Sequence, residues 1–312
     1  MAYSLKHINE LAKNDPKAFV EGTEAEFQRK LELAAKRIAS NRDKSHIILL
    51  SGPSGSGKTT TAMKIEKLLD ESGVETHTIS MDNYFNTIDP ETAPRNREGA
   101  IDYESPFCLD IDLLNRHFAM LDRGETIHIP KYEFARQMRS DILSQPLHLG
   151  KDELAIFEGI HALNDVIIGK NPQAFKLYIA ARSNVVDEDG SVVFYHHWLR
   201  LCRRIVRDYK FRGSNAEFTL KLWPNVRRGE KLYISPYKDT ADFQFDTSTP
   251  YEPAVFNRTA TELFRSVPEG IERFEELRAV LPALQLFGEI DESLVAADAL
   301  IREFIGGGIY EY

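Results

Sequence analysis

A glycine-rich run near residue 50 has the composition and spacing of a phosphate-binding loop. Residues 52–59 read Gly-Pro-Ser-Gly-Ser-Gly-Lys-Thr, which fits the pattern G-x-x-x-x-G-K-[ST]. Glycines let the backbone turn so that successive N–H groups face phosphate oxygens. We expect Lys58 to reach the β- and γ-phosphates of a nucleotide and the Thr59 hydroxyl to bind Mg²⁺. The expected phosphate-binding residues are Gly52, Ser54, Gly55, Ser56, Gly57, Lys58, Thr59 and Thr60.

Two carboxylates follow predicted strands and could take part in a reaction. Asp82 comes directly after the predicted strand 74–81, and Glu158 closes the apolar run 153–158. Open parallel sheets bind ligands at the carboxyl ends of their strands. Asp82 could accept a proton from a substrate hydroxyl and face Mg²⁺, and Glu158 has the position of a Walker B metal partner. The alternatives are an Asx-turn at Asp82 and a solvated strand end at Glu158.

Basic residues further along the chain could supply positive charge to a transferring phosphoryl group. Arg203 and Arg207 are one turn apart on a helix predicted over residues 192–209, and Arg212 lies just beyond it. Guanidinium groups form paired hydrogen bonds with phosphate, and a mobile lid that carries them could stabilise the transferring group. A solvated basic helix face is the alternative.

An aromatic and basic segment, residues 130–139, could bind a flat ring. Tyr132 and Phe134 offer two aromatic faces, and the neighbouring basic residues suit an anionic group. A hairpin whose aromatic side chains belong to the core is the alternative, and the sequence does not separate the two.

Elements on either side of these residues must bring them together. Residues 46–51 predict a buried parallel strand and residues 60–69 predict a helix, which is the context that the phosphate loop requires. Strands continue to alternate with helices along the chain. The sequence therefore predicts an α/β fold of the P-loop NTPase type: a three-layer sandwich with a mostly parallel sheet, a β-hairpin insertion and an arginine-bearing helical lid.

The bulk properties exclude several classes of protein. The 312 residues carry a net charge of −9, whereas a non-specific nucleic-acid binder usually has a basic excess. Cys108 and Cys202 lie far apart and outside any C-x-x-C pattern, which argues against a zinc site or a disulfide framework. No apolar run approaches the length of a membrane span. We expect a cytoplasmic protein without a nucleic-acid or membrane partner, and we leave open whether it is a homo-oligomer.

Together these motifs resemble the uridine kinase/phosphoribulokinase family of P-loop kinases, and they look closest to the bacterial uridine kinase-like nucleoside kinases. The resemblance covers residues 44–250, and its motifs keep the family's order along the chain. They are residues 52–60, 82–85, 102–110, 130–139, 158–160 and 203–208. The resemblance implies ATP as phosphate donor (with GTP as an alternative), Mg²⁺, and a small-molecule nucleoside as acceptor. It also implies a core over residues 44–260, an N-terminal helical appendage over 1–43 and a C-terminal helical extension over 261–312.

The resemblance also implies roles for single residues. Asp82 matches the catalytic base that takes the proton from the sugar 5′-hydroxyl, with Lys58 and Arg207 as catalytic cations. Thr59, Glu158 and Asp82 match positions near the metal. The substrate-side positions are Tyr84, Tyr103, Glu104, Tyr132, Phe134, Gln137, Arg139, Arg203 and Arg212.

Three positions depart from the family pattern. Glu104 and Gln137 replace an Asp that binds the ribose hydroxyls and a His that reads the pyrimidine, so base selectivity is in question. Ser214 replaces the second Arg of an Arg-Gly-Arg motif, a charge that Arg227 or Arg228 could supply. The predicted function is ATP- and Mg²⁺-dependent phosphorylation of a nucleoside 5′-hydroxyl, with uridine or cytidine as the leading acceptors. The alternatives are a kinase of a sugar phosphate or pantothenate, and a regulatory ATPase.

Overall fold

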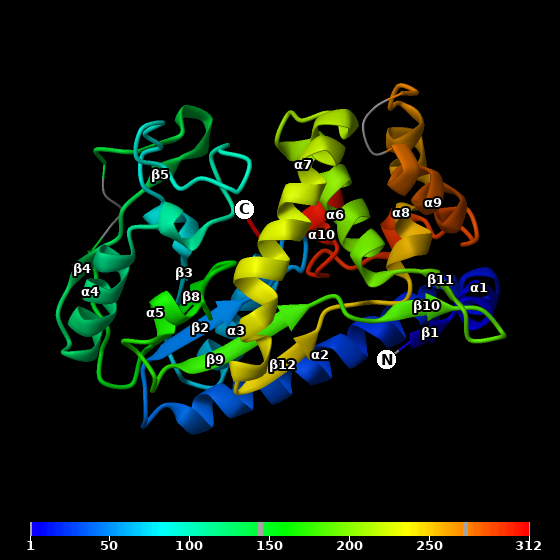
Figure 1. The fold of residues 1–312 in the computed structure, drawn as a ribbon. Helices are drawn as coiled ribbons and strands as arrows, with labels where there is room; N and C mark the ends of the chain where they lie inside the picture. Colours follow the sequence, from blue (N-terminus) through cyan, green and yellow to red (C-terminus); the bar gives the residue numbers. More distant parts are fainter. Residues whose placement is uncertain (1, 143–145, 271–273, 312) are drawn as a thin grey trace.

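A five-stranded parallel sheet forms the centre of the molecule in the computed structural model, which describes residues 2–142, 146–270 and 274–311 (Figure 1). Every pair of neighbouring strands is parallel. The strands in spatial order are β12 (Phe243–Asp246), β9 (Phe175–Ala180), β2 (Ile47–Ser51), β8 (Leu154–Glu158) and β3 (Thr76–Ser80). The predicted α/β fold with a parallel sheet is therefore confirmed.

The central strand β2 shows why the sheet needs helices on both faces. Its five residues are all buried, as expected for an interior parallel strand. Side chains alternate across the sheet, so Ile48 and Leu50 join the larger apolar cluster, which includes residues of α2 (Pro16–Asn41) and α3 (Lys58–Glu71). Ile47 and Leu49 point to the opposite face of the sheet. There they join a smaller apolar cluster with residues of α4 (Ile111–Asp122) and α5 (Asp165–Ile168).

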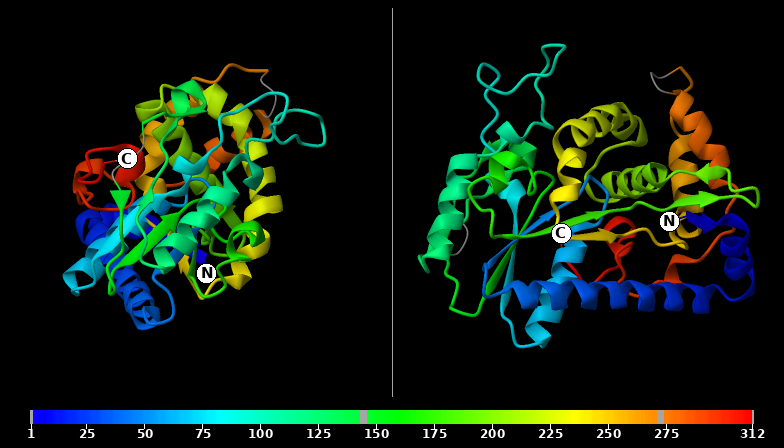
Figure 2. Two further views of the ribbon diagram at one scale, coloured as in Figure 1. Left: turned by 90° about the vertical axis from the view of Figure 1, so that its left-hand side faces the viewer. Right: turned by 60° about the horizontal axis from the view of Figure 1, so that its bottom comes forward.

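The N-terminal residues form more than the expected helices. A short strand β1 (Ala2–Ser4) precedes α1 (Leu5–Asn14) and pairs in parallel with β10 (Asn184–Val186). The long helix α2 runs beneath the sheet in Figure 1 and in the right-hand view of Figure 2, and its residues contact α3. Residues Phe27 and Leu31 of α2 are buried in the same apolar cluster as the sheet.

The predicted helix over residues 192–209 begins later than expected. Residues Val192–Phe194 form a strand, β11, which pairs with β10, and α6 covers His196–Phe211. Two β-branched residues and one aromatic residue favour a strand where a partner strand is available. The next helix, α7 (Ala216–Gly229), continues through a π-helical turn to Ile234.

Short antiparallel pairs form the predicted hairpin insertion between α4 and β8. Strand β4 (Ile127–His128) pairs with β7 (Pro146–Leu147), and β5 (Tyr132–Glu133) pairs with β6 (Met138–Arg139). In Figure 1 this insertion lies on the left of the molecule, with α6 and α7 to its right.

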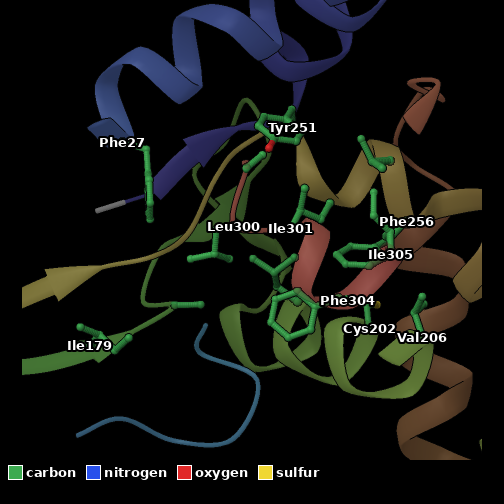
Figure 3. Packing of buried hydrophobic residues seen from close by; sticks show 14 of the residues in the cluster. Phe27, Ile179, Cys202, Val206, Tyr251, Phe256, Leu300, Ile301, Phe304 and Ile305 are labelled. Atoms are coloured by element: carbon green, nitrogen blue, oxygen red, sulfur yellow. The ribbon is translucent and has the colours of Figure 1, made fainter. Parts of the chain in front are cut away.

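The chain ends in helices that return to the core. These are α8 (Glu252–Arg265), α9 (Phe274–Leu284) and α10 (Arg302–Ile305). The side chains of Phe304 and Ile305 pack beside Cys202 and Val206 of α6 (Figure 3). Throughout the described ranges, no helix has the length and apolar character needed to cross a membrane.

Candidate active site

The phosphate-loop backbone requires its glycines. Gly55 and Gly57 have φ angles of 74° and 79°, in the left-handed region that glycine adopts without a steric penalty. Gly57 is also the N-cap of α3. A Cβ atom on Gly52 would lie 2.1 Å from the carbonyl oxygen of Ile179. The pattern read from the sequence therefore has a steric cause at each of these three positions.

Residues on α6 and after β12 hold the loop from one side. Arg200 Nε donates to the Ser54 carbonyl at 2.9 Å, and Thr247 Oγ1 donates to the Ser56 carbonyl at 2.7 Å. In a trans peptide the next N–H group points opposite to the carbonyl. The N–H groups of Gly55 and Gly57 therefore point away from these partners, as phosphate binding requires.

Lys58, Thr59 and Glu158 lie together at the start of α3 and the end of β8. The Thr59 hydroxyl donates to Glu158 Oε1 at 3.4 Å. Burial raises the pKa of the Glu158 carboxyl to about 7, the Lys58 charge lowers it, and the negative charge of Asp82 raises it further. Burial lowers the pKa of Lys58, and the carboxylates of Glu158 and Asp82 oppose that shift. A hydroxyl and a carboxylate so close together suit Mg²⁺, which prefers oxygen ligands.

Asp82 lies in a 3₁₀ turn, Met81–Tyr84, directly after β3. Asp82 is exposed to solvent overall. Protein atoms packed around its carboxyl group nevertheless raise the pKa of that group. The positive charges of Lys58, Arg212 and Arg207 lower the pKa of Asp82 in opposition. The structure thus brings the expected base and the expected cations within electrostatic range of one another.

Arg203 is located differently from the other arginines that the sequence suggested. Its side chain is fully buried, and two of its nitrogens donate to the Glu252 carboxylate at 2.7 Å each. It also donates to the carbonyls of Thr247 and Gly55. The expectation of a substrate-side Arg203 does not agree with this geometry, because the guanidinium is committed to protein acceptors. Arg203 instead holds the phosphate loop.

Arg207 of α6 and Arg212, which follows this helix, are close enough to Asp82 to lower its pKa. Arg207 donates to Asp208 at 3.1 Å and lies 3.9 Å from the Glu303 carboxylate. The Arg212 side chain is more than half exposed, 3.8 Å from Asp208. Both side chains are more exposed than that of Arg203.

Tyr84 and Arg139 also have structural partners. Tyr84 is fully buried, and its hydroxyl bonds with His117 Nδ1 at 2.8 Å. Arg139 pairs with Asp110 at 2.9 Å and donates to the carbonyls of Tyr84 and Phe85. Tyr84 has no exposed surface to offer a substrate, whereas the Arg139 side chain keeps 27% of its surface exposed and holds the segment that follows Asp82.

Three of the remaining acceptor-side candidates are exposed, whereas Tyr132 is buried, with 9% of its surface exposed. Tyr103 and Phe134 are 52% and 61% exposed, and Gln137 is exposed in a left-handed conformation with φ 51°. Phe134 lies edge-on to Tyr132, with ring centroids 5.0 Å apart. Exposed aromatic faces are the type of surface that can stack on a flat ring.

Glu104 lies beside a polar cluster formed by Asp102, Arg228 and Tyr233. Burial raises its pKa, and the charge of Arg204 opposes the shift. The neighbouring Asp102 is 2% exposed and accepts hydrogen bonds from Arg228 at 2.5 Å and from the Tyr233 hydroxyl at 2.9 Å. The charge expected from Arg228 in place of a lid arginine is therefore engaged by Asp102. Likewise, Arg227 pairs with Glu230 at 2.7 Å.

Sequence reasoning missed four residues that contact the phosphate loop. Arg200 is described above, and the others are Arg204, which donates to Ser54 Oγ, Thr247, and Glu303, which accepts from Thr60. Arg200 and Arg204 lie on the basic helix α6, so the sequence shows their identity but not the direction of their side chains. The other two lie more than 180 residues from the loop, and no local pattern marks them.

A glycine-rich loop between a strand and a helix, with carboxylates at the ends of two neighbouring strands, defines the P-loop class of nucleotide-binding proteins. The sequence model described as the phosphoribulokinase / uridine kinase family matches residues 47–251, more than half of the chain. The chain therefore belongs to the phosphoribulokinase/uridine kinase family. It is a phosphotransferase of the kinase type, and the family implies ATP as phosphate donor, usually with Mg²⁺.

Individual relatives show how far this similarity extends. A uridine kinase of Staphylococcus aureus (strain JH9) is 31% identical over 197 residues, which cover 63% of this chain and 84% of the relative. Among solved structures, one assigned as a fructose transport system kinase of Silicibacter sp. TM1040 is 18% identical, with a TM-score of 0.49, and covers 65% of this chain and 95% of that protein. One described as a possible uridine kinase of Bacillus stearothermophilus is 17% identical, with a TM-score of 0.47, and covers 71% and 100%.

Proposed function

We propose that this protein transfers the γ-phosphate of ATP to the 5′-hydroxyl of a nucleoside, with uridine or cytidine as the preferred acceptor. The observation that carries the proposal is the grouping of Asp82 with Lys58 and Glu158 at the phosphate loop. The similarity to proteins named uridine kinase supports the nucleoside acceptor. The family's own description covers a sugar-phosphate kinase as well as a nucleoside kinase, so membership alone leaves the acceptor open.

In the proposed mechanism the chain positions two reactants and neutralises charge. The loop N–H groups and Lys58 hold the β- and γ-phosphates of the donor. Asp82 accepts the proton of the acceptor hydroxyl as the new P–O bond forms, while the bond to the ADP leaving group breaks. Arg207 is close enough to Asp82 to influence its pKa, so it can also reach the charge that builds on the transferring group.

Thr59 and Glu158 are the residues that would hold Mg²⁺, with Asp82 nearby. When bound, the ion would screen the negative charge of the donor phosphates. Because Glu158 has a pKa near 7, a nearby cation would favour its ionised form.

The acceptor assignment draws on Phe134, Tyr132 and Tyr103. The exposed rings of Phe134 and Tyr103 favour a planar base over a sugar phosphate, which has no face to stack, and the buried Tyr132 packs against Phe134. Glu104 and Gln137 are the side chains that we assign to ribose and base recognition. Both can accept hydrogen bonds from a nucleoside.

A panel of acceptors tests the proposal. The purified protein is incubated with Mg–ATP and, in separate reactions, uridine, cytidine, other nucleosides, a sugar phosphate, pantothenate or no acceptor. We expect ADP release that depends on uridine or cytidine, together with a nucleoside 5′-monophosphate. The analogue 5′-deoxyuridine, which lacks the reacting hydroxyl, should inhibit competitively without being phosphorylated. ADP release at the same rate without acceptor would instead identify a regulatory ATPase, and turnover of only the sugar phosphate or pantothenate would reassign the acceptor.

A further inference from the structure

The C-terminal segment 295–306 lies directly against the phosphate loop. Its residues Leu300, Ile301 and Phe304 are almost completely buried in the larger apolar cluster (Figure 3). A Cβ atom on Gly57 of the loop would lie 2.6 Å from a methyl group of Leu300. Segment 295–306 therefore packs directly beside the proposed donor site.

One carboxylate of this segment contacts the first turn of α3. Glu303 is 8% exposed and accepts hydrogen bonds from the Thr60 hydroxyl at 2.6 Å and, more weakly, from the Thr60 N–H at 3.4 Å. Its other oxygen lies 3.9 Å from Arg207. The N–H groups of a first helical turn and a nearby arginine are groups that bind phosphate. Glu303 thus occupies donors that a nucleotide phosphate would otherwise use.

The negative charge of Glu303 reaches further into the site. Burial lowers the pKa of Lys58 and raises that of Glu158; the Glu303 charge opposes the first shift and adds to the second. A charge that favours the protonated form of Lys58 also opposes a phosphate anion bound at that lysine. Because Glu303 is buried, salt in the solvent screens this repulsion only partly.

We propose that Glu303 is a positioning residue of the donor site, which holds Thr60 and Arg207 in place and lowers the affinity for the phosphate donor by charge repulsion. The segment that carries it sets donor affinity below the value that the loop alone would give, which favours release of the nucleotide product. This inference rests on the proposed role of the loop in holding donor phosphates, and it does not depend on which acceptor the enzyme uses.

The variant Glu303→Gln tests the proposal, because glutamine keeps the size and one accepting oxygen but removes the charge. Mg–ATP affinity is measured by calorimetric titration without acceptor, so the result stands even if the nucleoside assignment fails. We expect binding about three- to tenfold tighter than in the wild type. The KM for ATP should fall by a similar factor with the acceptor KM unchanged. Unchanged or weaker ATP binding by the folded variant would overturn the proposal.

Two further variants separate charge from packing. Asp298→Asn removes the 3.0 Å ion pair of the same segment with Lys64 of α3 and does not touch Thr60. We expect it to lower thermal stability and leave ATP affinity unchanged; an equal gain in affinity would refute the specific role of Glu303, because any lost carboxylate of the segment would then act alike. If Glu303→Gln does not fold, Glu303→Met is measured in its place, with the same expected gain and the same overturning result.

Discussion

The donor half and the acceptor half of the proposed site are built from different kinds of contact. Around the phosphate loop, carbonyls, arginines and carboxylates are bonded to one another and mostly buried, as the full burial of Arg203 illustrates. On the acceptor side, Phe134 in a 3₁₀ turn and Tyr103 in a loop have more than half of their surface exposed. The same phosphate donor is used with every acceptor of such an enzyme, so a rigid binding loop suits it. Acceptor choice is left to side chains that few neighbours constrain.

Asp82 joins the two halves, and its loss should have the largest effect. In Asp82→Asn the base is removed while the loop is intact, so kcat should fall by about 10³-fold with Mg–ATP binding unchanged. Steady-state kinetics and calorimetric titration give the two values. Asp89→Asn, which changes an exposed acid in the segment after the turn that carries Asp82, is the control and should retain activity. Substantial turnover by Asp82→Asn would remove the base assignment.

The second prediction concerns the rigidity of the donor half. Arg203→Met leaves the buried Glu252 carboxylate without its partner, so the free energy of unfolding should fall by about 3–5 kcal/mol. Urea unfolding measures the change. The control Arg29→Met breaks an exposed pair with Glu26 and should cost less than about 1 kcal/mol. If Arg203→Met kept full stability and raised only the acceptor KM, Arg203 would belong to the acceptor half after all.

The third prediction follows from the pKa of Glu158, which burial raises from 4.5 to about 7. As the pH rises from about 4.5 to 7, the unfolded state loses this proton first, so the metal-free protein should lose stability over that interval. The loss is about 3 kcal/mol for a shift of this size. Urea unfolding of the wild type and of Glu158→Gln across this pH range isolates the contribution as a difference. Parallel curves for the two proteins would show that Glu158 does not titrate there.

The smallest effect is expected on the acceptor side. Phe134→Ala removes an exposed aromatic face, so the acceptor KM should rise several-fold while the KM for ATP and the stability stay unchanged. Initial-rate kinetics with each substrate varied in turn measures this. Phe218→Ala, which removes another ring from α7 with more than half of its surface exposed, is the control and should alter neither KM. Equal effects from the two variants would mean that Phe134 has no specific role.

The donor half could be predicted from the sequence further than the acceptor half. The loop glycines, Lys58 and Thr59 form one contiguous motif. Glu158 ends β8 and Asp82 lies just after β3, and the carboxyl ends of these neighbouring parallel strands lie at the same edge of the sheet. The same reasoning did not find the protein partners of Tyr84 and Arg139, because spacing does not say whether a polar side chain meets a ligand or another part of the protein. It also missed the strand at residues 192–194, because that strand requires β10 as a partner.

The sequence by itself determined the phosphate loop, the two strand-end carboxylates and the parallel α/β architecture, since each of these depends on neighbouring residues or on a repeating pattern. Only the tertiary structure decided which arginines of α6 hold the loop and that the chain's end contacts it. The partners concerned are far apart in the chain: Arg203 pairs with a carboxylate 49 residues away, and Thr60 with one 243 residues away. The energy of such contacts depends on burial and on the direction of each side chain, and both are properties of the packed molecule.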